Sequence, residues 1–292
     1  MEEPIETRQM AARPAPARRV ETVRIASTRG FGRLLNPGEL WRFREVALQI
    51  AARDVKVRYR QTLLGAAWAI LQPVGTMVVF TIFFGHLAHL SSEGSSYAVF
   101  SLSGLVPWTY FSNAVTLGSD SLVLNSPLVS KVYFPRIFIP AGVVAAGLVD
   151  LTIAFLILLV VAVASGTSLS LALFAVPLLV AITVAAALGV CSGLSAINVR
   201  YRDVRYVVPF ATQLWLFATP IAYPSTLLSH GWRIVAAINP MTGVVEGFRW
   251  AVLGKPAAPW TLIGVSAASA AVLLLLGLFY FDRVERRFAD II

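Results

Sequence analysis

The charged residues between Leu63 and Tyr280 lie in a few short clusters, and the stretches between these clusters are long enough to cross a lipid bilayer. A hydrocarbon core of about 30 Å requires about 20 apolar residues of helix. Hydrophobic residues make up 57% of the 292 residues and charged residues 13%, which is more apolar surface than a soluble chain of this length could bury. The sequence therefore predicts an all-α polytopic membrane protein with six transmembrane helices, at Leu63–Leu87, Tyr97–Leu117, Ile137–Ala164, Leu169–Ala196, Val207–Tyr223 and Trp260–Phe281.

Basic residues alternate between the predicted loops. The first 62 residues carry 13 Lys or Arg, the loops after the second and fourth segments and the C-terminal tail are also basic, and the loops after the first and third segments contain no Lys or Arg. The positive-inside rule then predicts that both termini are cytoplasmic, in the inner or plasma membrane of the cell. Because the net charge of +9 lies mostly where membrane flanks require it, no nucleic-acid partner is expected.

Four parts make up the predicted domain organisation. Residues 1–35 are polar, with Pro and Arg scattered among Ala and Thr, which is typical of a disordered cytoplasmic arm and not of a signal peptide. Residues 36–62 are expected to form an amphipathic interface helix, and residues 63–282 the transmembrane domain. Residues 283–292 form a cytoplasmic tail.

The interface helix is predicted from polar residues that recur every three or four positions, namely Arg42, Glu45, Gln49, Arg53, Lys56 and Arg60. Asp54 and Arg58 interrupt the opposite, apolar side. Such a helix would lie along the membrane with its basic face toward lipid headgroups or a partner. The alternative is an ordinary positively charged flank before the first transmembrane segment.

The sequence lacks the motifs of common catalytic sites. Gly254-Lys255 is followed by Pro256, so no phosphate-binding P-loop is present, and neither GxSxG nor HExxH occurs. No catalytic, cofactor-binding or metal-binding residue is therefore expected in this chain. Asp150 is the carboxylate near the middle of the third predicted segment, and it should be protonated or hydrogen-bonded to a neighbouring helix. A charge-dependent role is the alternative.

Two predicted cytoplasmic loops contain features that could contact a soluble partner. Ser126 and Pro127 can begin a short helix that Pro135 ends, which suits either insertion into a cleft or a simple connector. In the next loop, three arginines, at 200, 202 and 205, surround Asp203, which can pair with one of them. That loop is either a solvated charge cluster or a contact for headgroups or a partner's carboxylates.

Close helix packing and re-entrant structure are also predicted. Gly189 and Gly193 form a GxxxG motif, which permits close approach either within the subunit or between subunits. Between Pro224 and Pro259, the apolar segments Trp232–Ile238 and Gly243–Leu253 are expected to dip into the membrane as re-entrant helices at the outer side.

Several motifs follow one another in a characteristic order from about Leu40 to the C-terminus. They are Arg53-Asp54-Val-Lys-Val-Arg-Tyr-Arg60, Leu64-Gly65-Ala-Ala-Trp68, Leu71-Gln72-Pro73, Arg202-Asp203-Val204-Arg205, Thr219-Pro220-Ile221-Ala222-Tyr223-Pro224, Asn239-Pro240-Met241-Thr242-Gly243 and Glu246-Gly-Phe-Arg249. In this order they resemble the ABC-2 type permeases that export polysaccharides, a family that includes exporters of O-antigen, capsule, teichoic acid and galactan.

The resemblance implies an assembly and two cytoplasmic contact regions. Two copies of the permease would work as a homodimer with two copies of a separate ABC ATPase, which would bind ATP and Mg, so this chain itself would not be an enzyme. A coupling helix would comprise Pro127, Leu128, Val129, Ser130, Lys131, Val132, Tyr133 and Phe134. The interface helix and the third cytoplasmic loop would contribute Arg53, Asp54, Arg58, Arg202, Asp203 and Arg205.

The resemblance also implies that the first and fifth transmembrane segments line a conduit. Aromatic rings can stack on sugar rings and amides can hydrogen-bond in a wet lumen, although Trp and Tyr also gather at membrane interfaces. The candidates are Trp68, Gln72, Trp108, Tyr110, Gln213, Trp215, Phe217 and Tyr223.

The function expected from the sequence is therefore that of a permease subunit for a lipid-linked polysaccharide, either O-antigen-like or teichoic-acid-like. The alternative is an ABC-2 exporter of a smaller or non-glycan substrate. A membrane-embedded transferase is a third class. Paired carboxylates in the membrane or its loops would favour it, and the sequence indicates none.

Overall fold

The computed structural model describes residues 37–60, 67–92, 94–131 and 134–285. All regular elements within these ranges are helices. In chain order they are α1 (Pro37–Arg42), α2 (Arg44–Arg60), α3 (Ala67–Phe80), the π-helix η2 (Thr81–Leu87), α4 (Tyr97–Leu124), α5 (Ser126–Lys131), α6 (Phe138–Ala164), the 3-10 helix η3 (Leu171–Ala175), α7 (Val176–Arg200), α8 (Val204–Ala218), the 3-10 helix η4 (Ser225–Leu227), α9 (His230–Ala236), α10 (Pro240–Leu253) and α11 (Trp260–Glu285). The predicted arm 1–35, Val132, Tyr133 and residues 286–292 of the predicted tail lie outside the described residues.

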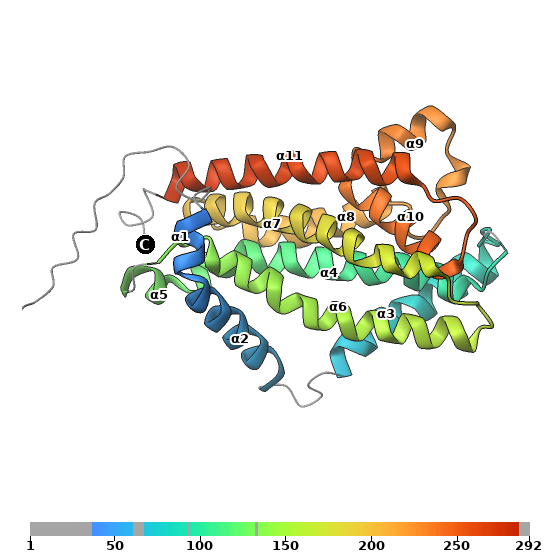
Figure 1. The fold of residues 1–292 in the computed structure, drawn as a ribbon, viewed down its shortest axis with the longest axis horizontal. Coiled ribbons are helices and arrows are strands. Elements are labelled where there is room, and N and C mark those ends of the chain that lie inside the picture. Colours follow the sequence, from blue (N-terminus) through green and yellow to red (C-terminus); the bar gives the residue numbers. More distant parts are fainter. Residues whose placement is uncertain (1–36, 61–66, 93, 132–133, 286–292) are drawn as a thin grey trace, which may run out of the picture. The chain divides into compact units, whose positions relative to one another are not determined.

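Four long helices, α4, α6, α7 and α11, run side by side in Figure 1. We call one end of this bundle the α5 end, where Arg136 Nη1 donates a hydrogen bond to the Glu285 carbonyl at 2.8 Å. The opposite end, which carries α9 and α10, is called the α9 end (Figure 1). The all-α prediction is confirmed for the described residues.

Four of the six predicted transmembrane segments coincide with helices that are long and apolar enough to cross a membrane, at Ile70–Leu87, Phe138–Ala164, Leu171–Arg200 and Trp260–Glu285. The second, α4, has 28 residues but is rich in Ser and Gly, and most of its side chains are buried against other helices. The fifth, α8, has 15 residues and therefore spans about 22 Å. The four helices of spanning length named first support a polytopic membrane protein. The count of six transmembrane helices remains a prediction.

Glycines decide how α7 packs. A Cβ added to Gly277 of α11 would lie 1.9 Å from the Gly189 carbonyl oxygen, and the Gly277 Cα is 3.7 Å from a Cβ placed on Gly193. The GxxxG motif of α7 is therefore used within the chain, against α11. The sequence left this open because the matching Gly277 is 84 positions from Gly193 and 88 from Gly189.

The two predicted re-entrant segments are helices, with somewhat different bounds, as α9 and α10. Asn239 caps α10 by accepting a hydrogen bond from Met241 N at 3.0 Å, Pro240 occupies its first turn, and Gly254 ends it with a φ of 64°. Twelve of the 14 residues of α10 are buried, because it packs between α4, α7 and α11. Whether the two helices enter the membrane from the outer side stays a prediction.

Candidate functional site

The predicted interface helix is broken at Phe43 into α1 and α2, and α2 packs along the first half of α6 (Figure 1). Ile50 is buried there in a cluster with Phe138 and Ile139 of α6, and Phe43, Val46 and Ala47 pack against the same cluster. The approach is close because a Cβ on Gly142 of α6 would lie 2.7 Å from Ile50 Cγ2. The residues of the predicted polar stripe are exposed, except Arg53, which is half-buried.

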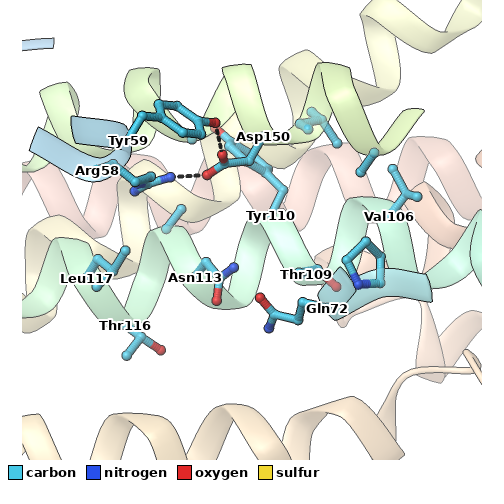
Figure 2. A pocket seen from close by; sticks show the side chains of 15 residues that line it. Arg58, Tyr59, Gln72, Val106, Thr109, Tyr110, Asn113, Thr116, Leu117 and Asp150 are labelled. Carbon is cyan, nitrogen blue, oxygen red and sulfur yellow. Dashed lines mark hydrogen bonds and ion pairs between the residues drawn. The ribbon is translucent and has the colours of Figure 1, made fainter. Parts of the chain in front are cut away.

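The end of α2 carries two side chains that reach α6. Arg58 forms an ion pair with the Asp150 carboxylate through Nη1, and the Tyr59 hydroxyl donates a hydrogen bond to the other carboxylate oxygen (Figure 2). About a quarter of each charged side chain of the pair is exposed. The prediction that Asp150 is hydrogen-bonded to a neighbouring helix is confirmed, and Arg58, which looked like an interruption of the apolar side, is its charged partner.

A cavity of about 320 Å³ lies beside this pair, between α2, α3, α4 and α6. Its walls combine the carboxylate and guanidinium with amides and hydroxyls, from Gln72, Thr109, Asn113 and Thr116 (Figure 2). A charged pair beside polar groups of this kind costs less than one enclosed by apolar side chains. The cavity can therefore admit water or a polar ligand to the junction of α2 with the bundle.

The environment of Tyr59 keeps its hydroxyl protonated. Burial has the largest effect, the hydrogen bond to Asp150 adds to it, and together they raise the pKa of the Tyr59 phenol to about 12. The hydroxyl therefore acts as a hydrogen-bond donor to the carboxylate throughout the physiological range.

A second polar contact joins α2 to the end of α4. Arg53 Nη2 lies 2.8 Å from Asp54 Oδ1 and also donates to Asn125 Oδ1 at 2.9 Å. Asp54 Oδ2 is buried without a hydrogen-bond partner among the described residues. Asp54 and Arg58, which break the amphipathic pattern of the sequence, therefore both belong to the face that contacts the bundle.

The predicted third cytoplasmic loop has exposed charges. Arg202, Asp203 and Arg205 are exposed, and Arg205 Nη2 donates to the Tyr206 hydroxyl at 2.8 Å. No ion pair joins Asp203 to an arginine in the part of the chain that the structure describes, so the expected pairing within this cluster is absent there.

The predicted coupling segment is partly packed into the protein. Its helix, α5, covers Ser126–Lys131, and Val129 and Phe134 are buried in the same cluster as Ile50. Pro127 is exposed and Leu128 is half-buried. Apolar residues of this loop therefore anchor it to the α5 end of the bundle.

The conduit candidates fall into three groups. Trp108 and Tyr110 are buried in α4, where Trp108 contacts Trp215 edge-to-face and the Tyr110 hydroxyl donates to the Val144 carbonyl at 3.0 Å. Tyr110 also lines the 320 Å³ cavity. The conduit role of the two residues stays a prediction. Trp215 and Tyr223 are half-buried, whereas Gln72, Gln213 and Phe217 are exposed. Trp68 belongs to α3.

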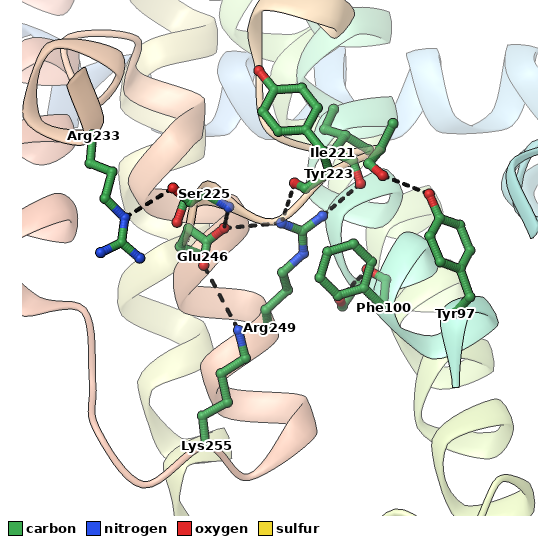
Figure 3. A network of polar contacts seen from close by, with 11 residues as sticks. Tyr97, Phe100, Ile221, Tyr223, Ser225, Arg233, Glu246, Arg249 and Lys255 are labelled. Carbon is green, nitrogen blue, oxygen red and sulfur yellow. Dashed lines mark hydrogen bonds and ion pairs between the residues drawn. The ribbon is translucent and has the colours of Figure 1, made fainter. Parts of the chain in front are cut away.

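A second charged cluster lies at the α9 end and was not singled out as a site from the sequence. The Arg249 side chain is completely buried and donates hydrogen bonds to the Ile221 carbonyl at 2.6 Å and to Glu246 Oε1 at 3.0 Å (Figure 3). Its guanidinium also lies 3.7 Å from the ring centroid of Phe100. Opposite charges three residues apart in an apolar helix were the signal that could have identified it.

Arg249 and Tyr97 fix the non-helical segment that follows α8. Arg249 Nη1 also donates to the Tyr223 carbonyl at 3.3 Å, and the Tyr97 hydroxyl donates to the Ala222 carbonyl at 2.6 Å (Figure 3). Backbone carbonyls that no helix satisfies are thereby paired inside the protein.

Comparison with known proteins agrees with this architecture. The sequence profile of the ABC-2 type transporter family matches residues 46–253, and the chain belongs to that family. Members of such families are transport subunits in the membrane.

Curated relatives align over most of the chain. It is 29% identical over 254 residues to the O-antigen export system permease protein RfbA of Myxococcus xanthus, covering 86% of this chain and 97% of that protein. The protein of the same name from Klebsiella pneumoniae is 26% identical over 85% of this chain and 95% of its own length. The polysialic acid transport protein KpsM of Escherichia coli is 22% identical, covering 80% and 91% respectively.

Proposed function

We propose that this chain is the permease subunit of an ABC exporter that moves a lipid-linked polysaccharide from the cytoplasm across the cell membrane. The observation that carries the proposal is the alignment with an O-antigen export permease over 97% of that protein, so the whole transmembrane unit is shared. A second relative is named for polysialic acid transport, and this supports a glycan over a smaller substrate.

The proposed assembly is a homodimer with two copies of a separate ATPase, which supplies ATP and Mg. Exposed faces on α3 and α8 support it. On α8 the apolar side chains of Val207, Phe210, Leu214 and Phe217 are exposed together, and Gln213 is exposed beside them. On α3 the exposed Gln72 is accompanied by Leu71 and Val79. In the proposed dimer these faces line the conduit, with Gln72, Gln213 and Phe217 toward the glycan and Trp68 as a further candidate.

The proposed orientation places the α5 end in the cytoplasm with both termini. The six-span arrangement then puts α9 and α10 at the outer side. Cysteines introduced at Ser130 and at Ser168, in a Cys191→Ala background, test this arrangement. Only the cysteine at Ser168 should react with a membrane-impermeant thiol reagent added to intact cells; reaction at Ser130 would reverse the orientation.

The coupling helix Pro127–Phe134 and the exposed charges Arg202, Asp203 and Arg205 are proposed to contact the ATPase. The burial of Val129 and Phe134 supports this role, because a loop that is anchored in the bundle can transmit a push from the ATPase to the helices.

The test uses a strain that makes a lipid-linked glycan but lacks its own exporter, supplied with this chain and an ATPase encoded beside it. Surface glycan should appear only when both are present. Ser130→Asp should reduce copurification of the ATPase about tenfold, which corresponds to a loss of about 1.4 kcal/mol in binding free energy. Ser168→Asp makes the same change at the other end of the bundle and should leave copurification unchanged. Export of a non-glycan substrate without surface glycan would overturn the proposal.

A further inference from the structure

A second cavity, of about 270 Å³, lies at the α9 end between α9, the end of α10 and the start of α11. It is separate from the α2–α6 junction and from the proposed conduit faces. The side chains that matter for its chemistry are Arg233, Glu246, Trp250, Lys255, Pro259 and Trp260.

Positive charge dominates this cavity. Glu246 accepts through Oε1 from the buried Arg249 at 3.0 Å and from Ser225 N at 3.4 Å, so its charge is already compensated. Lys255 Nζ lies 4.0 Å from the other carboxylate oxygen and forms an ion pair with it (Figure 3). Glu246 thus balances one charge among three cations, Arg233, Arg249 and Lys255, so the described charges in and beside the cavity sum to a positive value.

The backbone holds Arg233 in place. Arg233 Nε donates to the Ser225 carbonyl at 2.9 Å (Figure 3). The planar end of an arginine fixed in this way matches two oxygens of a phosphate, and a lysine ammonium contributes as a point charge.

The remaining walls are apolar and partly exposed. Trp250 and Trp260 lie with ring centroids 5.6 Å apart, and 57% of Trp260 is exposed. Ile234 lines the cavity, and Trp232 on the same short helix is 67% exposed. Cations next to exposed Trp side chains are the combination expected at the boundary between headgroups and acyl chains.

We propose that this cavity binds the phosphate of an anionic phospholipid, with Arg233 and Lys255 holding the phosphate and Trp260 and Ile234 contacting the glycerol and the first part of an acyl chain. A free phosphate ion would use the two cations and leave the apolar walls unused, which favours the lipid. The bound lipid would join α9, α10 and α11 at the α9 end.

Native mass spectrometry of the full-length chain in detergent tests the proposal, after incubation with phosphatidylglycerol or with phosphatidylcholine. The wild type should retain phosphatidylglycerol in preference to phosphatidylcholine. The double variant Arg233→Gln/Lys255→Gln should bind phosphatidylglycerol about tenfold more weakly. Arg233→Lys/Lys255→Arg, which keeps both charges, should retain binding. The matched control Arg44→Gln/Arg283→Gln removes the same charge from exposed positions outside the predicted polar stripe and should bind like the wild type.

Location is tested by a phosphatidylglycerol that carries a photoreactive group near its glycerol. Crosslinked peptides should contain residues 230–236 or 250–262. Equal retention of the two lipids by the wild type, or equal losses in the cavity variant and the control variant, would overturn the proposal. Complete displacement of the lipid by millimolar inorganic phosphate would identify a free-anion site instead and would equally reject the lipid. None of these measurements depends on export.

Discussion

The Arg249–Glu246 and Arg58–Asp150 pairs contain the same chemical groups in different surroundings. Arg249 has no exposed side-chain surface, and its partners include two backbone carbonyls and the face of Phe100. Arg58 and Asp150 each keep about a quarter of their side chains exposed beside the 320 Å³ cavity. The first pair lies three residues apart on one helix, whereas the second joins α2 to α6.

This difference separates a fixed part of the molecule from one that can move. Removing one partner of a buried pair leaves an uncompensated charge without water, so the surrounding structure depends on that pair. A pair beside a polar cavity can exchange its contacts for water at modest cost. We therefore infer that the segment after α8 is held rigidly at the α9 end, while the junction of α2 with α6 can open.

The largest effect is expected from Arg249→Ala. It leaves Glu246 buried with less compensation and unpairs the Ile221 and Tyr223 carbonyls, so the variant should lose about 3–5 kcal/mol of stability. Thermal unfolding of the detergent-purified chain measures this loss. Arg205→Ala, at an exposed arginine, is the control and should unfold like the wild type. If Arg249→Ala and Arg205→Ala unfolded at the same temperature, the Arg249–Glu246 pair would not be a fixed part of the molecule.

A smaller effect is expected at the other pair. The single variants Arg58→Ala and Asp150→Ala and their double variant form a thermodynamic cycle, and the coupling between the two residues should be about 1 kcal/mol because water reaches the pair. The same unfolding assay gives the value. A coupling as large as the loss in Arg249→Ala would mean that the junction is as closed as the α9 end.

Alkaline pH should loosen the same junction through Tyr59. The pKa of Tyr59 is about 12 in the folded state and about 10 in the unfolded state. Its contribution to the free energy of unfolding is therefore fully present below about pH 10 and is lost as pH rises to about 12. The difference in tyrosinate absorbance between the wild type and Tyr59→Phe follows this titration. A titration of Tyr59 centred near pH 10 would show that the hydroxyl is not held by Asp150.

The smallest effect is expected from Asp150→Asn. Tyr59 and Arg58 donate to different oxygens of Asp150, and the single amide oxygen of Asn can still accept from one of them. Water in the adjoining cavity can accept from the other, so export and membrane levels should stay close to those of the wild type. Surface glycan measured in the export strain tests this. Loss of export at normal membrane levels would show that the charge of Asp150 has a function beyond holding α2.

The sequence predicted less of the candidate site than of the fold. Arg58 and Asp54 appeared as defects in an amphipathic helix, because periodicity assigns one face to lipid and the other to water. In the structure a third environment exists, the side of α6, where a charged residue finds a charged partner. Asp150 lies 92 positions from Arg58, and no local pattern connects positions so far apart.

The segment after α8 shows the same limit. Its residues were noted as a motif, but the reason for the motif is a contact between Arg249 and carbonyls 26 and 28 positions earlier. Trp108 and Tyr110 were predicted to line a conduit on their residue type, and the structure adds that both are buried in α4, where they contact Trp215 and the Val144 carbonyl.

The sequence by itself determined where apolar helices are long enough to cross a bilayer, because hydrophobic length is a local property. It also predicted the end of α10 at Leu253, but placed its start at Gly243, whereas the Asn239 cap begins the helix at Pro240. Only the tertiary structure decided that α7 packs on α11 through Gly189 and Gly277, that α4 is enclosed, and that Arg58 meets Asp150. These outcomes depend on which surfaces meet, and contacts between distant segments are selected by shape and charge in three dimensions.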